Sequence, residues 1–329
     1  MMIKEDSTLM KALARLTQDS LKKVLGNALK DLYKEVVETK SYIYAVGDIP
    51  IALVAHMDTV FTSLPTNIYY DKEKHVMWSP EGLGADDRAG IYAILQILKA
   101  GYKPTVIFTT DEEIGAVGAG NLVADVPNFP TNLSYVIQLD RRGINDCVYY
   151  DCDNKEFKSY IENFGFEETL GSFSDISVIC PAWKVAGVNL SVGYVDEHTP
   201  LERVNFKYLH QTIDKVIAML NEEEVPAFEY VEMQYFYNQT GPVNYREEDD
   251  EYSFLRTKCH RCGRYSYAYN MVPAISKDGQ DTHYYCIDCC GHGISWCDEC
   301  FEAYEDGDKP SMICPRCLAK KKEVKEGRK

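Results

Sequence analysis

The sequence predicts an α/β protein: a three-layer sandwich with a mostly parallel central sheet, followed by a small cysteine-rich module. Two observations lead to this prediction. Apolar runs of strand length alternate with segments of helical periodicity along the first 220 residues. Nine of the twelve cysteines are then concentrated between residues 259 and 317.

Residues 8–38 carry apolar side chains at helical spacing and are expected to form one or two helices, with a break near Gly26. A later helix is expected over residues 89–98, with Asp86 or Asp87 as its N-cap and Gly101 at its end. A short helix follows the glycine-rich segment 115–120, and residues 206–220 form the last helix. The expected strands are residues 41–46, 51–54, 105–110, 135–139 and 189–195, with a short hairpin over 68–78.

The charge is uneven along the chain. The net charge is −16; residues 1–255 carry −18, and those from Arg256 onward carry +2. An acidic body repels nucleic acid and suits cations such as metal ions and free amino termini. No apolar run approaches the ~20 residues of a membrane helix, and the N-terminus lacks the apolar stretch of a secretory signal. A cytoplasmic protein is therefore expected.

Metal-ligating residue types follow four of the apolar runs. His56 and Asp58 close the first run, and side chains two positions apart on a strand share a face. The other runs end on Asp111-Glu112-Glu113, Asp140 and Asp196-Glu197-His198. Each of these, and Asp86 in GLGADDRAG (82–90), has an ordinary interpretation alone, as a helix cap or a solvated loop charge. Together, beyond the carboxyl ends of strands, they predict a metal-centred active site.

The chain resembles the di-zinc exopeptidase superfamily of aminopeptidases, tripeptidases and carboxypeptidases. Five motifs in the family's order carry the resemblance: AHMDTV (55–60), GLGADDRAG (82–90), TTDEEIG (109–115), LDRRG (139–143) and DEHTPLE (196–202). Only 58 positions separate Asp140 from His198, too few for the lid domain of the larger members. The resemblance therefore implies the compact, single-domain form, in which Ser172–Asp175 resembles a serine-aspartate segment near the site.

The resemblance also implies the roles of individual residues. One metal would be held by His56 and Asp140, the other by Glu113 and His198, with Asp86 bridging them. Asp58 would orient His56, and Glu112 would be the general base. The implied metals are two catalytic Zn²⁺ ions, with Co²⁺ or Mn²⁺ as alternatives. The acidic Asp196-Glu197 pair is unusual beside the last histidine, and either anchors a substrate's amino group or is surface charge.

The expected function is hydrolysis of amide bonds in small peptides, as an aminopeptidase. Two alternatives stay open: an N-acyl amino acid amidohydrolase, and a non-catalytic binding scaffold that acts through the cysteine module. The intact Glu112 argues against the scaffold, which has no need of a base.

The cysteine-rich module contains four CxxC pairs, a strong signal for two structural zinc ions. The pairs are Cys259/Cys262, Cys286/Cys289, Cys297/Cys300 and Cys314/Cys317. Sequential pairing would give two zinc ribbons, and interleaved pairing a cross-brace; sequential pairing is slightly favoured. Cys290 is either a spare thiol or the true metal ligand in place of the adjacent Cys289. The module either docks a protein partner or is a structural appendage, and its near-neutral charge gives no support for nucleic acid.

These observations divide the chain into four segments. They are a catalytic domain over residues 1–225, an acidic and aromatic linker over 226–255, the two-zinc module over 256–320 and a basic tail over 321–329.

Overall fold

The protein is described here by a computed structural model. It describes residues 6–129, 132–233, 256–263, 265–267, 271–286, 289, 294–297, 303–305 and 313–326. The chain forms two compact units, Met1–Tyr235 and Phe236–Lys329. None of the helices in the described part has the length and hydropathy that a membrane span requires.

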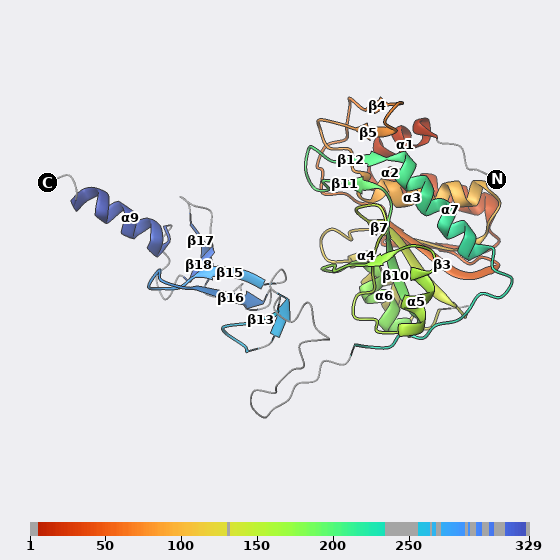
Figure 1. The fold of residues 1–329 in the computed structure, drawn as a ribbon. Coiled ribbons are helices and arrows are strands. Elements are labelled where there is room, and N and C mark those ends of the chain that lie inside the picture. Colours follow the sequence, from red (N-terminus) through yellow and green to blue (C-terminus); the bar gives the residue numbers. More distant parts are fainter. Residues whose placement is uncertain are drawn as a thin grey trace. The chain divides into compact units, whose positions relative to one another are not determined.

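The first unit is built on an eight-stranded sheet whose four central strands are parallel (Figure 1). Antiparallel pairs of β1 with β2, β2 with β6 and β10 with β8 flank this centre. In spatial order the strands are β1 (Val36–Glu38), β2 (Tyr42–Ala45), β6 (Pro104–Thr109), β3 (Ile49–His56), β7 (Tyr135–Arg141), β10 (Gly187–Ser191), β8 (Asp146–Val148) and β9 (Glu167–Glu168). The central strands are buried along nearly their whole length, as parallel strands covered on both faces must be.

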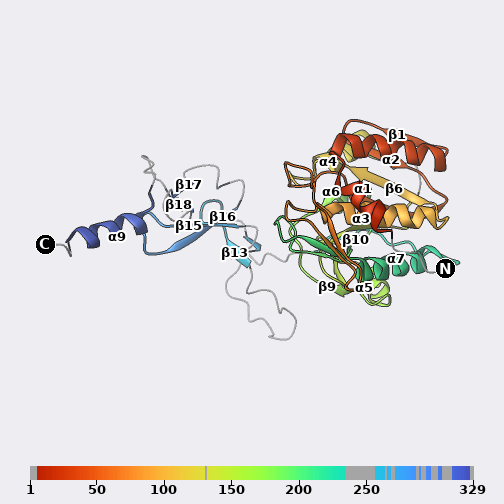
Figure 2. The ribbon, with the colours of Figure 1, turned by 90° about the horizontal axis from the view of Figure 1, so that it is seen from above.

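Helices cover both faces of this sheet, so the predicted three-layer α/β sandwich is confirmed (Figures 1 and 2). Alternate residues of β3 enter two separate cores: Ile51, Leu53 and Ala55 face one, and Ala52 and Val54 face the other. The first core is closed by α1 (Ser7–Ala14), α2 (Gln18–Leu32), α3 (Ala85–Lys99), α5 (Lys155–Glu162) and α7 (Phe206–Leu220). The second is closed by α4 (Val117–Asp125) and α6 (Asp175–Trp183).

A smaller antiparallel sheet lies beside the main one in this unit. It contains the predicted hairpin, as β4 (Tyr69–Asp71) and β5 (Val76–Trp78), with β12 (Arg203–Asn205) and β11 (Tyr194–Val195). The run 189–195, expected to be one strand, is divided between the two sheets. The chain turns at Gly193, where φ is +78°, a conformation that glycine adopts without strain.

The start of the chain also differs from the prediction. The break between the first helices lies at Arg15–Thr17, because the side chain of Thr17 caps α2 by accepting a hydrogen bond from Ser20 N. Gly26 is buried inside α2. Residues 36–38 are not helical but form the edge strand β1.

The predicted linker lies only partly within the described residues. Residues 226–233 pack on the first unit, where Phe228 contacts the core and Asp153 N donates a hydrogen bond to Val231 O at 2.7 Å. Residues 234–255 lie outside the described part, as do 327–329 of the predicted basic tail.

The second unit is a small β module. Strands β13 (Arg256–Lys258) and β14 (Tyr265–Tyr267) form a hairpin. The other four form one sheet, ordered β16 (Thr282–Cys286), β15 (Met271–Ile275), β18 (Ala303–Glu305) and β17 (Ile294–Trp296). Helix α9 (Pro315–Glu326) follows. The buried clusters described here are few and built partly from cysteines, which fits the predicted small zinc module.

Close packing of α3 on β7 generates a prediction about stability. A Cβ atom on Gly90 would overlap the carbonyl oxygen of Leu139, whereas one on Gly120 in α4 would meet nothing within 4 Å. We expect Gly90→Ala to lower the free energy of unfolding of the first unit by about 1–3 kcal/mol. Gly120→Ala, the matched control, should leave it unchanged or raise it by up to ~1 kcal/mol. Urea denaturation of both variants checks this, and equal midpoints would contradict the packing.

Candidate metal centre

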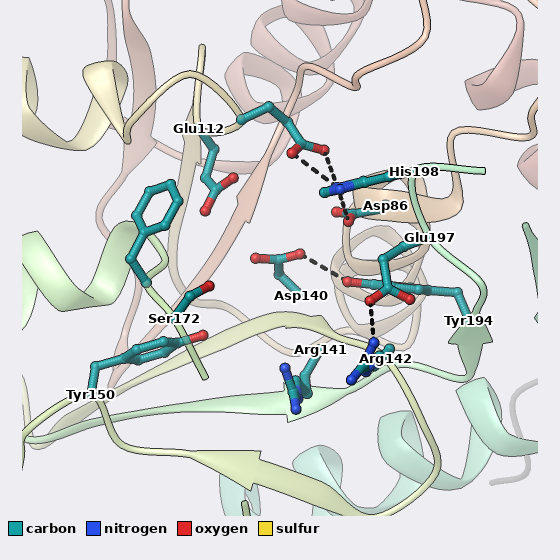
Figure 3. A pocket seen from close by; sticks show the side chains of 12 residues that line it. Asp86, Glu112, Asp140, Arg141, Arg142, Tyr150, Ser172, Tyr194, Glu197 and His198 are labelled. Carbon is teal, nitrogen blue, oxygen red and sulfur yellow. Dashed lines mark hydrogen bonds and ion pairs between the residues drawn. The ribbon is translucent and has the colours of Figure 1, made fainter. Parts of the chain in front are cut away.

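A pocket opens where β3, β6 and β7 end, and acidic side chains dominate its lining (Figure 3). The lining residues come from separate parts of the sequence, because parallel strands deliver their carboxyl ends to one edge of the sheet. The lining residues include Asp86, Glu112, Glu113, Asp140, Tyr194 and His198.

His56, the last residue of β3, is fully buried below this pocket. Its Nδ1 lies 3.2 Å from Asp58 Oδ1. A proton on Nδ1 therefore points at Asp58, which leaves the Nε2 lone pair facing the pocket. Nε2 lies 3.0 Å from Asp86 Oδ1 and 3.5 Å from Asp140 Oδ1.

Asp86 lies between two groups of potential ligands. While its Oδ1 faces His56, its Oδ2 lies 3.2 Å from His198 Nε2. His198 Nε2 in turn lies 3.0 Å from Glu113 Oε2. Each side of Asp86 thus has one imidazole nitrogen and one further carboxylate, Asp140 on one side and Glu113 on the other. The side chain of His198 is 48% exposed, so this half of the site is open to solvent.

The electrostatics of the cluster call for positive charge. Burial raises the pKa of Glu112 to about 10, and burial followed by the charge of Asp86 raises that of Asp140 to about 6. Hydrogen bonds to Asp86 and Glu113 raise the pKa of His198 to about 10. Carboxylates this close repel one another unless protons or cations lie between them. Histidine nitrogens and carboxylate oxygens are the ligands that Zn²⁺ accepts, so the donor set fits such an ion on either side of Asp86.

Glu112 lies beside this cluster, with its carboxylate directed into the pocket (Figure 3). Its Oε2 is 4.0 Å from His56 Nε2. The backbone holds it there: the N–H groups of Glu112 and Glu113 donate to the two oxygens of Asp58, each at 3.0 Å. Asp58 therefore contacts His56 and also positions the loop after β6.

Two further carboxylates hold the start of α3: Glu202, which was not predicted, and Asp87, one of the two residues expected to cap this helix. Glu202, 0% exposed, accepts hydrogen bonds from the N–H groups of Ala85 and Asp86. Asp87 accepts from His56 N at 3.2 Å and from Gly90 N at 2.8 Å, and the second bond is typical of an N-cap, as predicted for this residue. The Asp86–Asp87 peptide bond is cis. Glu202 ends the DEHTPLE motif, and its place in that motif was the only sequence signal for it.

Asp140 is held by neutral hydrogen-bond donors, one of them in the segment that was expected near the site. Ser174 Oγ donates to its Oδ2 at 3.0 Å, and Tyr194 OH to its Oδ1 at 3.2 Å. Ser174 belongs to the Ser172–Asp175 segment, of which Ser172 lines the pocket. The acidic pair before His198 is balanced within the chain, because Asp196 pairs with Arg203 and Glu197 with Arg142.

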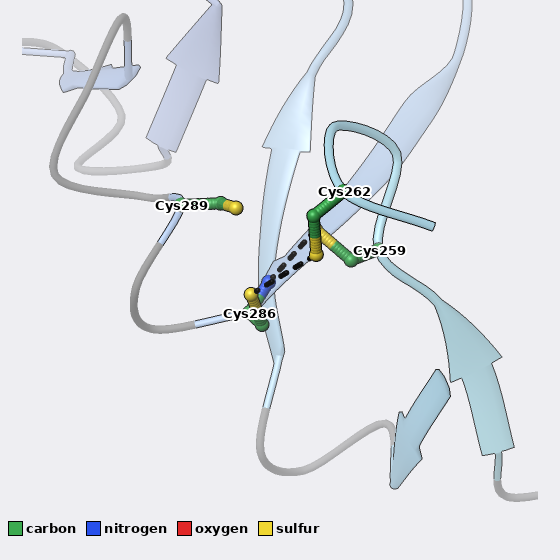
Figure 4. A group of neighbouring side chains, drawn as sticks. All are labelled: Cys259, Cys262, Cys286 and Cys289. Carbon is green, nitrogen blue, oxygen red and sulfur yellow. Dashed lines mark hydrogen bonds between the residues drawn. The ribbon is translucent and has the colours of Figure 1, made fainter. Parts of the chain in front are cut away.

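The cysteines of the second unit come together in sequential pairs. The sulfur atoms of Cys259, Cys262, Cys286 and Cys289 all lie within 4.8 Å of one another, with 3.7 Å between those of Cys262 and Cys286 (Figure 4). Cys297, Cys314 and Cys317 form a second such group. Cys300, expected to be its fourth member, and Cys290 lie outside the described residues. Four convergent sulfurs suit a tetrahedral Zn²⁺ site, and this grouping corresponds to sequential rather than interleaved pairing.

Comparisons with known proteins identify the fold of the first unit. No family model and no curated protein matches the sequence. A tripeptidase from Staphylococcus aureus subsp. aureus Mu50 aligns with 66% of this chain and 98% of its own, at 15% identity and a TM-score of 0.53. The TET aminopeptidase from a marine sediment archaeon of the Thaumarchaeota aligns with 66% and 97%, at 12% identity and a TM-score of 0.52. The resemblance to the exopeptidases is thus confirmed for the fold.

The support that Glu202 gives to Asp86 can be tested. Glu202→Ala leaves two buried N–H groups without an acceptor, so we expect it to lower the free energy of unfolding of the metal-free protein by about 1–3 kcal/mol per group. Asp196→Ala, which removes a half-exposed ion pair near the same loop, should change it by less than about 1 kcal/mol. Urea denaturation in the presence of a chelator measures both. A Glu202 variant as stable as the Asp196 variant would argue against the role.

Proposed function

We propose that the protein is a metal-dependent hydrolase that cleaves amide bonds of small peptides, as an aminopeptidase. One observation supports this above all: the two oxygens of Asp86 lie 3.0 and 3.2 Å from two histidine nitrogens. A carboxylate in that position suits a ligand shared by two ions. The fold shared with a tripeptidase and an aminopeptidase agrees with the proposal.

In this proposal His56, Asp140 and Asp86 hold one metal ion, and His198, Glu113 and Asp86 hold the other. Zn²⁺ suits this mixture of nitrogen and oxygen ligands, with Co²⁺ or Mn²⁺ as alternatives. Ions held there would supply Lewis acidity toward water and the scissile carbonyl. Asp58 keeps the His56 ring in the tautomer whose Nε2 is free to bind, through the contact of 3.2 Å at Nδ1.

Glu112 is the proposed general base. Its carboxylate would accept a proton from the attacking water and then donate that proton to the nitrogen of the leaving amine. Its position supports the role, because it lines the same pocket as Asp86, Asp140 and His198. The hydrogen bonds from Glu112 and Glu113 to Asp58 fix the base relative to His56.

In the second unit, we propose two structural zinc ions. One would be held by Cys259, Cys262, Cys286 and Cys289, and the other by Cys297, Cys314 and Cys317 together with Cys300. Thiolate ligands that converge from two CxxC pairs contribute folding free energy when the metal binds.

The metal sites predict the metal content of the purified protein. Mass spectrometry should find about four ions per chain in the wild type and about two in the double variant His56→Ala/His198→Ala. Asp196→Ala, a carboxylate near His198 that is already paired with Arg203, should keep all four. If the wild type and the double variant both contain about two ions per chain, only the cysteines bind metal. That result would refute the hydrolase proposal and favour the scaffold alternative.

The proposed base predicts the activity of a matched variant. Glu112→Gln keeps the size of the side chain but cannot accept the proton, so kcat for a dipeptide and tripeptide panel should fall by about 10²–10⁴-fold. The metal content should not change. Full activity in a variant that retains its metal would exclude Glu112 as the base.

A further inference from the structure

One arginine in the pocket has no carboxylate partner among the residues that the structure describes. Arg141, the last residue of β7, lines the pocket directly after Asp140. Among the described residues its side chain makes one hydrogen bond, from Nη2 to the carbonyl oxygen of Leu170, at 2.9 Å. Its Nε is buried and has no acceptor. A guanidinium has five N–H donors, so most of its capacity is unused.

The other cationic groups of the pocket are paired. Arg142, the next residue, forms an ion pair of 2.9 Å with Glu197. His198 contacts both Asp86 and Glu113. Arg141 and Arg142 are therefore the same residue type in the same pocket, and only Arg142 has a carboxylate partner among the described residues. Substitution of Arg142 is thus a suitable control for substitution of Arg141.

The position of Arg141 relates it to the proposed chemistry. In the view of Figure 3 the guanidinium lies on the side of the pocket near Tyr150 and Arg142, across Asp140 from Glu112. The bond to Leu170 restrains the guanidinium before any ligand binds, which reduces the entropy lost on binding. The planar guanidinium fork fits a carboxylate better than any other common anion-binding side chain does.

We propose that Arg141 binds a carboxylate of the substrate, so that the site takes short peptides with a free carboxylate close to the scissile amide. The inference rests on the proposed hydrolase function. The first part of the chain carries −18 and repels anions at long range. A local cation without a partner is what allows an anionic substrate to enter such a site. The carboxylate belongs either to the C-terminus of a dipeptide or to an acidic side chain.

The test compares peptides that differ only in charge. The probes are Ala-Ala and its C-terminal amide for the first source, and the amides of Ala-Glu and Ala-Gln for the second. For one of these pairs, wild-type kcat/KM should favour the acid by at least about tenfold, mainly through KM, because the neutral analogue leaves Arg141 unpaired. The pair that shows the preference identifies the source of the carboxylate.

Variants assign the preference to Arg141. Arg141→Met should abolish it, and Arg141→Lys should retain part of it, because lysine keeps the charge but not the fork. Arg142→Met, the matched control, should keep the wild-type ratio of acid to amide within about twofold, since it removes an exposed ion pair. A ratio that Arg141→Met leaves unchanged would overturn the proposal.

A binding measurement separates this inference from the proposed function. Calorimetry with the Glu112→Gln protein measures the affinity for the same four probes without turnover. Hydrolysis by the wild type without any preference for the acids would refute the carboxylate site and leave the hydrolase intact. Tighter binding of an acid that depends on Arg141, with no hydrolysis by the wild type, would establish the anion site and refute the hydrolase. If the protein shows no binding preference for the acids and does not hydrolyse any probe, both proposals are refuted.

Discussion

The candidate site depends on one repeated interaction, a carboxylate that accepts two backbone N–H groups. A ligand cluster built from loops loses its geometry if those loops move, and charge-assisted hydrogen bonds to the backbone prevent this. Three carboxylates at the edge of the sheet act in this way. Asp58 holds Glu112 and Glu113, Asp87 holds His56 and Gly90, and Glu202 holds Ala85 and Asp86.

This arrangement divides the acidic residues of the site into two classes. Those that hold the backbone accept backbone N–H groups, and Asp58 also contacts His56 Nδ1 from outside the pocket, whereas Asp86, Glu113 and Asp140 direct oxygens toward the Nε2 atoms of the two histidines. The second class is acceptable in a partly buried pocket only when positive charge lies among its members. The acidic composition of the first unit is therefore partly structural and partly the chemistry of the proposed metal centre.

The two units are stabilised by different means. The first buries two large apolar cores, one on each face of its sheet. The described clusters of the second are small and include Cys259, Cys297 and Cys314 among their buried members. A domain with so little apolar burial gains stability from metal–thiolate bonds, so its folding should be linked to zinc in a way that the first unit's folding is not.

The sequence by itself determined the fold class, most element positions and the residues that could bind metal, because these depend on local periodicity and on motifs. The spacing of His56 and Asp58 predicted that their side chains lie together, and they do, at 3.2 Å, although β3 ends at His56 and Asp58 lies beyond it. The sequence did not locate the break between the first two helices, which the cap at Thr17 sets. It also did not show that the run 189–195 divides into two strands at the turn of Gly193.

Only the tertiary structure decided which side chains meet, because such contacts join residues far apart in the chain. It paired Glu202 with the start of α3, Glu197 with Arg142, and the CxxC motifs in sequential order. It also left Arg141 without a carboxylate partner in the described part of the chain. Local sequence carries no record of these distances, and the packing of the sheet edge sets them.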